Sequence, residues 1–297
     1  MARRAVLIAT GLALLGFAGI LLVTQPRPGP MDDLQAVAGD ASRGKPVFVA
    51  AGCASCHMAP GAEGDARLVL TGGMGFASAF GTFLAPNISP DPTHGIGGWT
   101  LEQFASAIRD GISPEGQHYF PALPYNAYNK MTGQDVADLW AYLQTLPPSA
   151  EPSKPHEVGF PFNIRRMLGG WKLLFQSRDW QMDPVATPEL ERGRYLVEAL
   201  AHCTECHTPR NALGGLDRSR WLAGAPTPDG KGRTPNITPA KLTWGEGEIF
   251  DYLTTGFTPD FDSVGGPMAH VVDSMAQLPE TDVRAVVAYL KALPGVE

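Results

Sequence analysis

The sequence has few cysteines, little charge and no extended run of basic residues, and each scarcity narrows the possible functions. Its 297 residues include four cysteines and 18% charged residues, with 23 Lys and Arg against 30 Asp and Glu. A net charge of −7, with no basic run longer than the pairs Arg3-Arg4 and Arg165-Arg166, leaves no electrostatic footprint for nucleic acid. At 44% hydrophobic residues the chain is neither disordered nor a polytopic membrane protein. Its length allows one to three domains and an ample apolar core.

One long apolar run lies at the N-terminus. Residues 5–24 carry no charge and are long enough to cross the hydrocarbon core of a bilayer. Arg3 and Arg4 precede the run, so the positive-inside rule places them in the cytoplasm and the rest of the chain outside. A cleaved signal peptide is the alternative, but its small-x-small site would follow the run closely, and residues 36–38 (AVA) lie well beyond it. We therefore expect a retained anchor, a Pro-rich tether over residues 25–30 and an exported body.

The four cysteines form two motifs of the same pattern. In each, two residues separate the cysteines and a histidine follows at once: Cys53, Cys56 and His57, then Cys203, Cys206 and His207. This is the attachment pattern of c-type haem, in which two thiols form thioethers and the adjacent histidine ligates the iron from the proximal face.

Other interpretations of the cysteines are weaker. A Cys₄ zinc site has its pairs about 15–20 residues apart, whereas about half the chain separates these two. Structural disulfides would not need a histidine after both pairs, and a thioredoxin-like centre needs a βαβ context that is absent. The sequence therefore predicts two covalently bound haem c groups and no disulfide.

The sequence around the two motifs repeats. A Pro-Asn-Ile tripeptide recurs at residues 86–88 and 235–237, and a similar segment recurs at residues 135–147 and 282–294. The last two segments carry apolar residues at i, i+3, i+4 and i+7, which indicates one apolar face of a helix in each copy. In the tripeptides, Asn87 and Asn236 either fix the adjacent loops or bond a haem propionate.

Capping signals place several helix starts. Thr132 and Asp135 have capping-box spacing, whereas Pro279 replaces the threonine in the second copy. Helices are also predicted before each cysteine motif, at residues 43–51 and 188–201, the second with Thr187 as its cap. No convincing alternating strand pattern appears. The predicted fold class is all-α, and each copy runs helix, motif, loops, short helix, distal loop and final helix.

This order of elements resembles the class I cytochrome c fold, present twice in tandem. More closely, the chain resembles the membrane-bound cytochrome c subunits of bacterial periplasmic alcohol and aldehyde dehydrogenases. The closer resemblance is carried by residues 85–89 (APNIS), 95–100 (GIGGWT), 118–131 (HYFPALPYNAYNKM), 160–175 (FPFNIRRMLGGWKLLF) and 234–238 (TPNIT). It covers nearly everything after residue 40, although the best-known members carry three haems and this sequence has two attachment motifs.

The expected domains follow from the repeat. An N-terminal anchor and tether occupies residues 1–30, the first cytochrome c domain residues 31–150, a connector residues 151–185 and the second cytochrome c domain residues 186–297. Within the connector, residues 160–180 combine apolar and basic side chains. We expect this segment to pack across the two haem domains; the alternative is a docking surface for a partner subunit or the membrane interface.

A low-spin electron carrier needs a sixth ligand on each iron, and methionine raises the reduction potential relative to a second histidine. Met131 lies just before the final helix of the first copy, where class I cytochromes place this ligand, and His118 is its local competitor. In the second copy Met268 lies in a loop that resembles the family's ligand-bearing loop, with Met275 and His270 as alternatives. We expect Met131 and Met268 to complete the two iron sites.

The resemblance implies an electron-transfer protein, or an electron-transfer subunit of a dehydrogenase complex, and not an enzyme. Electrons would enter from a periplasmic dehydrogenase, pass between the haems and leave to a terminal oxidase or a soluble cytochrome of the respiratory chain. The expected location is the bacterial inner membrane, with a single N-terminal span and the haem domains in the periplasm. The alternative is a diheme redox enzyme, a peroxidase or sulfur-compound dehydrogenase with one open haem, for which His118, His270, Asp260 and Asp262 are candidate acid–base groups.

Overall fold

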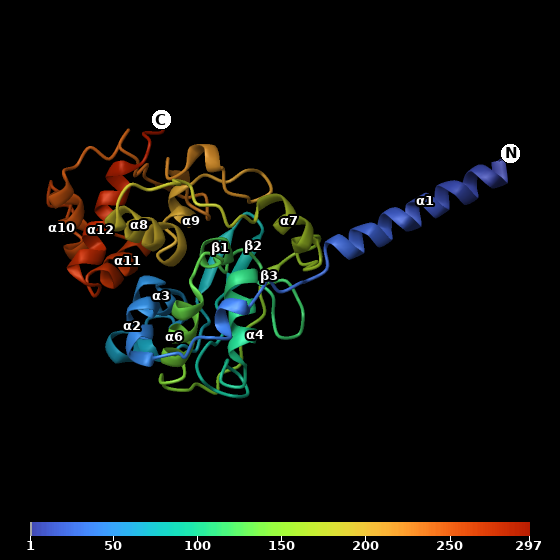
Figure 1. Cartoon of the computed structure of the whole chain (residues 1–297), viewed down its shortest axis with the longest axis horizontal. Coiled ribbons are helices and arrows are strands. Elements are labelled where there is room, and N and C mark those ends of the chain that lie inside the picture. The colour runs from blue at the N-terminus through green and yellow to red at the C-terminus, as the bar shows by residue number, and fades with distance from the viewer. Residues whose placement is uncertain (1) are drawn as a thin grey trace.

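In the computed structural model, which describes residues 2–297, the N-terminal apolar run forms a helix that projects away from the body (Figure 1). Helix α1 (Ala2–Val23) has 22 residues and none of them is buried. At about 1.5 Å per residue its length matches a hydrocarbon core about 30 Å thick. It is the one helix among residues 2–297 that is long and apolar enough to cross a membrane, a test that a signal sequence near the N-terminus would also pass.

Helices make up most of the regular structure and follow the order predicted for two copies, except that each predicted distal loop contains a helix of its own. The helices of the first half are α2 (Ala41–Ala50), α3 (Cys53–His57), α4 (Leu101–Ala105), α5 (Tyr125–Tyr128) and α6 (Gly133–Leu143). Their counterparts in the second half are α8 (Pro188–Tyr195), α9 (Thr204–His207), α10 (Glu246–Thr255), α11 (Pro267–Met275) and α12 (Glu280–Ala292). Helix α7 (Met167–Phe175) lies between the halves, and π-helical turns at Ser106–Asp110 and Leu196–Leu200 extend α4 and α8. The all-α fold class is confirmed.

The loops contain short strands that the sequence did not predict. Strands β1 (Gly75–Ser78), β2 (Gly81–Leu84) and β3 (Glu157–Val158) form an antiparallel sheet, and β4 (Ala225–Pro226) pairs with β5 (Arg233–Thr234). Runs of two to four residues are too short to show an alternating pattern. Strand β3 comes from the connector, so the start of the connector adds an edge strand to the sheet of the first half.

The helix caps largely agree with the expectations. Thr187 accepts a hydrogen bond from the backbone N–H of Leu190 (3.2 Å), and Thr132 accepts one from that of Asp135 (3.1 Å). The Asp135 carboxylate does not return to Thr132; it accepts from the hydroxyl of Tyr195, which lies on α8. The predicted capping box is therefore half formed, because its acidic member joins the two halves of the body.

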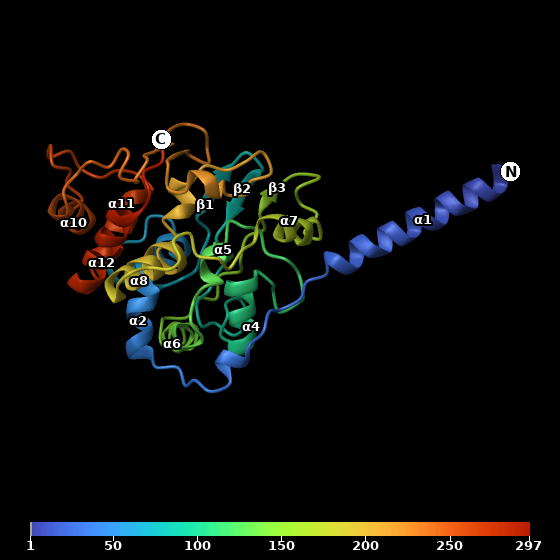
Figure 2. The same ribbon diagram turned by 45° about the horizontal axis from the view of Figure 1, so that its top comes forward.

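The same helix crossing occurs in each half. The helix before the cysteine motif packs on the final helix of that half: α2 on α6 and α8 on α12 (Figure 2). Gly44 of α2 lies so close to α6 that a Cβ would be 1.9 Å from the Asp138 carbonyl oxygen. Gly193 of α8 lies equally close to α12, where a Cβ would be 2.0 Å from the Ala285 carbonyl oxygen. These glycines let the backbones touch, so both halves are built around the same close contact.

This contact predicts that Gly193→Ala destabilises the second half. The added methyl group must push α8 away from α12, and overpacking of this kind costs about 1–3 kcal/mol. Gly247→Ala is the matched control, because a Cβ at Gly247 in α10 would have no other atom within 4 Å. Denaturant unfolding followed by far-UV circular dichroism should show a lower midpoint for Gly193→Ala only. Equal midpoints for the two variants would mean that the crossing tolerates a side chain.

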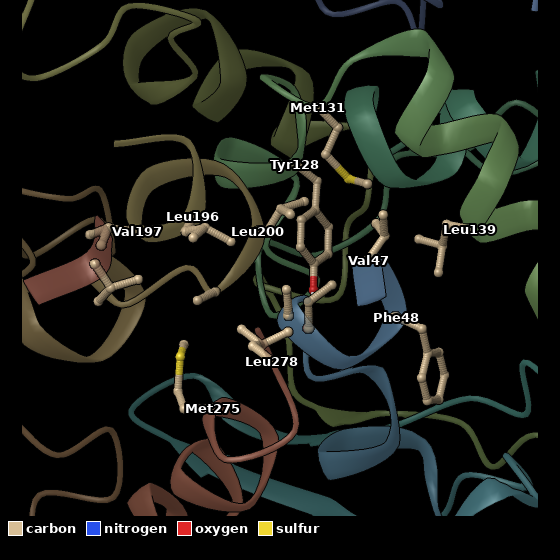
Figure 3. Packing of buried hydrophobic residues seen from close by; sticks show 14 of the residues in the cluster. Val47, Phe48, Tyr128, Met131, Leu139, Leu196, Val197, Leu200, Met275 and Leu278 are labelled. Atoms are coloured by element: carbon tan, nitrogen blue, oxygen red, sulfur yellow. The ribbon is translucent and has the colours of Figure 1, made fainter. Parts of the chain in front are cut away.

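One hydrophobic cluster runs through both halves (Figure 3). Val47, Tyr128 and Met131 enter it from the first half, and Leu200 and Met275 from the second. Figure 3 shows Tyr128 between the side chains of the two halves. The cysteine motifs thus border a common apolar core.

Candidate functional site

Each cysteine motif occupies one turn of helix. Cys53 begins α3, and Cys203 directly precedes α9, so in each motif the two cysteines and the histidine are spaced as neighbours on a helix surface. All four cysteines are unpaired. Burial raises the pKa of the Cys53 thiol, and likewise that of Cys203, to about 12. Among residues 2–297 no three His, Cys, Asp or Glu side chains form a cluster that could hold a metal ion.

The two motif histidines are held in the same way. The Nδ1 atom of His57 lies 2.9 Å from the Pro86 carbonyl oxygen, and that of His207 lies 2.8 Å from the Pro235 carbonyl oxygen. Because a carbonyl only accepts, each Nδ1 donates its proton, which leaves the Nε2 lone pair free for a metal. Burial lowers the pKa of both imidazoles, although the hydrogen bonds to the proline carbonyls oppose it. Both rings are thus neutral and are held in one orientation by the same kind of contact.

The Pro-Asn-Ile tripeptides supply these carbonyls, and their asparagines fix the loops. The Asn87 amide donates to the carbonyls of Ser149 and Glu151, both at 2.8 Å, and the Asn236 amide donates to the Val296 carbonyl at 2.6 Å. Their side-chain oxygens accept from the backbone two residues on, at 2.9 and 2.8 Å. The loop-fixing interpretation therefore accounts for both asparagines.

The methionine predicted as the distal ligand of the first half lies in the core. Met131 is 3% exposed, and its carbonyl accepts a hydrogen bond from Arg109, which pairs with Asp33 at 2.7 Å. This network holds the loop before α6 in place. The competitor His118 is also buried, but its Nε2 lies 3.0 Å from the Thr24 carbonyl oxygen and joins the end of the apolar run to the body. Met131 therefore stays the candidate for the distal iron ligand of the first half.

The second half offers two methionines on one helix. Met268 lies near the start of α11 and is partly buried, whereas Met275 near its end is 2% exposed and belongs to the shared core (Figure 3). His270 lies between them, with a partly exposed side chain. The expectation that Met268 lies in a loop is therefore wrong, because Pro267 already begins α11. Burial favours Met275, and the resemblance of the sequence around Met268 favours Met268, so Met268 remains a prediction that variants of both residues will test.

The acidic residues of the enzyme alternative lie away from the core. Asp260 and Asp262 are both exposed in the loop between α10 and α11. The buried carboxylate of this half is instead Glu198, which accepts hydrogen bonds from the Tyr289 hydroxyl and from the Gln181 backbone. Burial raises the pKa of Glu198, against the hydrogen bond from Tyr289. This structural carboxylate, which sequence reasoning missed, ties the connector to α12.

The two cysteine motifs meet across the boundary between the halves. The Tyr128 hydroxyl donates to the Ala51 carbonyl at 2.9 Å, and its ring lies edge-on to the His202 ring with centroids 5.7 Å apart. Ala51 lies two residues before Cys53, and His202 directly precedes Cys203. Burial, followed by the neighbouring Cys206, raises the pKa of the Cys56 thiol to about 11. No sequence pattern signalled this contact, because it depends on how the halves pack.

The donor set of each half fits a c-type haem. Each half provides a cysteine pair, a neutral histidine with a free Nε2, a buried methionine and apolar walls. These are the groups that covalent attachment and axial ligation of haem require.

Comparison with known proteins agrees with this assignment. The family model for cytochrome c matches residues 41–147 and 190–294. A diheme cytochrome c-type protein of Cereibacter sphaeroides is 55% identical over 295 residues, which are 99% of this chain and 100% of that protein. The cytochrome subunit of fructose dehydrogenase from Gluconobacter japonicus is 42% identical over 86% of this chain and 52% of its own length. The cytochrome c subunit of alcohol dehydrogenase (quinone) from Gluconobacter oxydans is 34% identical over 86% of this chain and 55% of its own. The chain thus spans the whole of the first relative and about half of the other two.

Proposed function

The chain belongs to the cytochrome c family, and we propose that it is a membrane-anchored diheme cytochrome that carries electrons from a periplasmic dehydrogenase to the respiratory chain. The observation that carries this proposal is that Tyr128 contacts both Ala51 and His202, the residues just before the two cysteine motifs, and so brings the motifs close together. Two redox centres attached beside one another can exchange electrons within one chain. The dehydrogenase partner is supported by relatives that are named as cytochrome subunits of fructose, alcohol and gluconate dehydrogenases.

The residues of the chain have distinct roles in this proposal. The cysteine pairs would hold two haems covalently, and His57 and His207 would ligate the irons through Nε2. Met131 and Met268 would be the distal ligands, and the shared apolar core would exclude water from the centres. Bound haem supplies reversible one-electron chemistry, whose potential the axial ligands and the enclosure set.

Helix α1 would confine the carrier to the outer face of the bacterial inner membrane. Its apolar length and the two arginines that precede the run support a retained span, with the haem domains in the periplasm. Confinement to the same surface raises the effective concentration of a membrane-bound acceptor, either a terminal oxidase or a soluble cytochrome docked there. The proposed domains, residues 31–150 and 186–297 with the connector 151–185 between them, each contain one of the two family matches.

Deletion of the chain from its host tests this function. Oxygen uptake by membranes would be measured with a primary alcohol, a sugar, a sugar acid and an aromatic carboxylic acid as electron donors. These are the substrate classes in the names of related alcohol, fructose, gluconate and nicotinate dehydrogenase subunits. We expect uptake with one of these donors to be lost, and to be restored by the intact chain but not by a chain that lacks Cys203 and Cys206. Unchanged uptake with all four donors would contradict a role between these dehydrogenase classes and the respiratory chain.

A further inference from the structure

Exposed apolar side chains outside α1 gather in one short segment. Ten large apolar side chains outside that helix are exposed among residues 2–297, and six of them lie between residues 160 and 174. We call these six residues the α7 patch: Phe160, Phe162, Ile164, Met167, Leu173 and Leu174. Phe160 is 82% and Leu174 is 69% exposed. Such a concentration marks an interaction surface, because single exposed apolar residues are normally scattered.

Helix α7 has two faces, and only one of them serves the packing expected from the sequence. Lys172 is buried, donates to the Gly111 carbonyl at 2.8 Å and lies over the Tyr125 ring at 4.5 Å. Trp171 packs edge-on to the same ring and donates to the Leu213 carbonyl at 2.9 Å. The inner face therefore joins the two halves. Because these contacts fix the rotation of α7, Met167, Leu173 and Leu174 are held toward the outside.

The α7 patch lies at the base of α1. A Cβ on Gly169 would be 2.3 Å from the Thr24 carbonyl oxygen, and Arg166 donates to the Thr24 hydroxyl at 3.1 Å and to the Leu21 carbonyl. Figures 1 and 2 both show α7 in the part of the body nearest the end of α1. Thr24 is the last residue of the apolar run. If α1 spans the bilayer, Thr24 lies at its outer surface, and the α7 patch lies at the same level.

We propose that the α7 patch inserts into the interfacial zone of the membrane and holds the body in one orientation on the lipid surface. A lipid bilayer fits the patch better than a protein partner because the patch continues the surface of a membrane-spanning helix. Arg165 and Arg166 lie within this segment and are partly exposed, so positive charge lies where anionic headgroups would be. Two attachments, a span and an interfacial helix, would stop the body from tumbling on its tether. The inference rests on the proposed anchor.

Fluorescent labels at three sites test the proposal. The four native cysteines are assigned to haem attachment, so a single introduced cysteine gives one free thiol per chain. L174C places a label in the α7 patch, L12C places one in α1, and F261C is the matched control. Phe261 is 85% exposed and lies in the loop between α10 and α11, at the end of the body remote from α1 (Figure 1). The full-length holoprotein would be placed in vesicles of phosphatidylcholine and phosphatidylglycerol, and quenching by brominated acyl chains compared with quenching by iodide.

We expect the labels in L12C and L174C to be quenched by the brominated lipid and to lose iodide quenching, while the label in F261C shows the reverse. Iodide quenching in L174C together with lipid quenching in L12C would overturn the patch and leave the anchor intact. No lipid quenching at either site would contradict the anchor itself. Protection of L174C from both quenchers would show a second copy covering the patch. Protection that requires a co-purified dehydrogenase would show a protein partner, and either result would overturn the proposal.

Discussion

Replacement of both Cys203 and Cys206 by alanine is expected to leave one covalent haem per chain in place of two. With no thiol in the second half, no thioether can form there, whereas the first motif is untouched. The loss should also unfold much of the second half, because a group that the folded core encloses contributes its binding energy to folding. Mass spectrometry of the intact chain gives the number of attached haems, and the alkaline pyridine spectrum gives haem per protein.

The matched variant replaces Cys53 and Cys56 by alanine. It should leave one haem in the second half, so the two variants have the same haem content but different remaining centres. Both should lose electron transfer from donor to acceptor if the electron must pass through both centres. Two haems in either variant would mean that the motifs do not attach them. Full transfer activity in one variant would mean that its missing centre lies off the electron path.

Replacement of Met131 by alanine should change one haem and leave the other intact. Without the methionine sulfur as its sixth ligand, the iron of the first half becomes five-coordinate or takes up water. Its Met–iron charge-transfer absorption is therefore lost and its high-spin fraction rises. Its reduction potential should fall on the order of 0.1 V, since axial ligation sets haem potentials over a range of about 0.8 V. A spectroelectrochemical titration measures both changes. Met167→Leu is the control, because Met167 is an exposed methionine on α7.

The same titration on Met268→Ala and Met275→Ala identifies the distal ligand of the second half. If Met268 is the ligand, its loss removes the second charge-transfer signal, whereas Met275→Ala keeps the signal and lowers stability by about 2–5 kcal/mol, as expected for a buried methionine. Loss of the signal in Met275→Ala alone would reassign the ligand to the buried residue. Retention of both charge-transfer signals in all three alanine variants would contradict the methionine assignments.

The sequence predicted the features that depend on local spacing. The helices before the cysteine motifs and the final helices of both halves occur where apolar periodicity, Thr132 and Thr187 indicated them. The motif histidines needed no structure to be recognised, because the cysteine spacing defines them. The 55% identity with a diheme cytochrome c-type protein agrees with the inference drawn from those motifs.

Features that depend on packing between distant segments could not be predicted. The contact of Tyr128 with Ala51 and His202 depends on how the two halves dock, and neither half alone contains a pattern for it. The burial of Glu198 beside Tyr289 is of the same kind, since a glutamate in an amphipathic helix normally faces solvent. Residues 160–180 were expected to pack across the two haem domains; that holds for Trp171 and Lys172 but leaves the α7 patch exposed.

An optical spectrum of the purified holoprotein, oxidised and reduced, before and after carbon monoxide, tests the central claim most directly. Two closed iron coordination spheres predict two covalent haems that are low-spin in both states and unchanged by the gas. A haem that is high-spin or binds carbon monoxide would reveal an open iron. That result would contradict the electron-carrier account and favour a diheme redox enzyme.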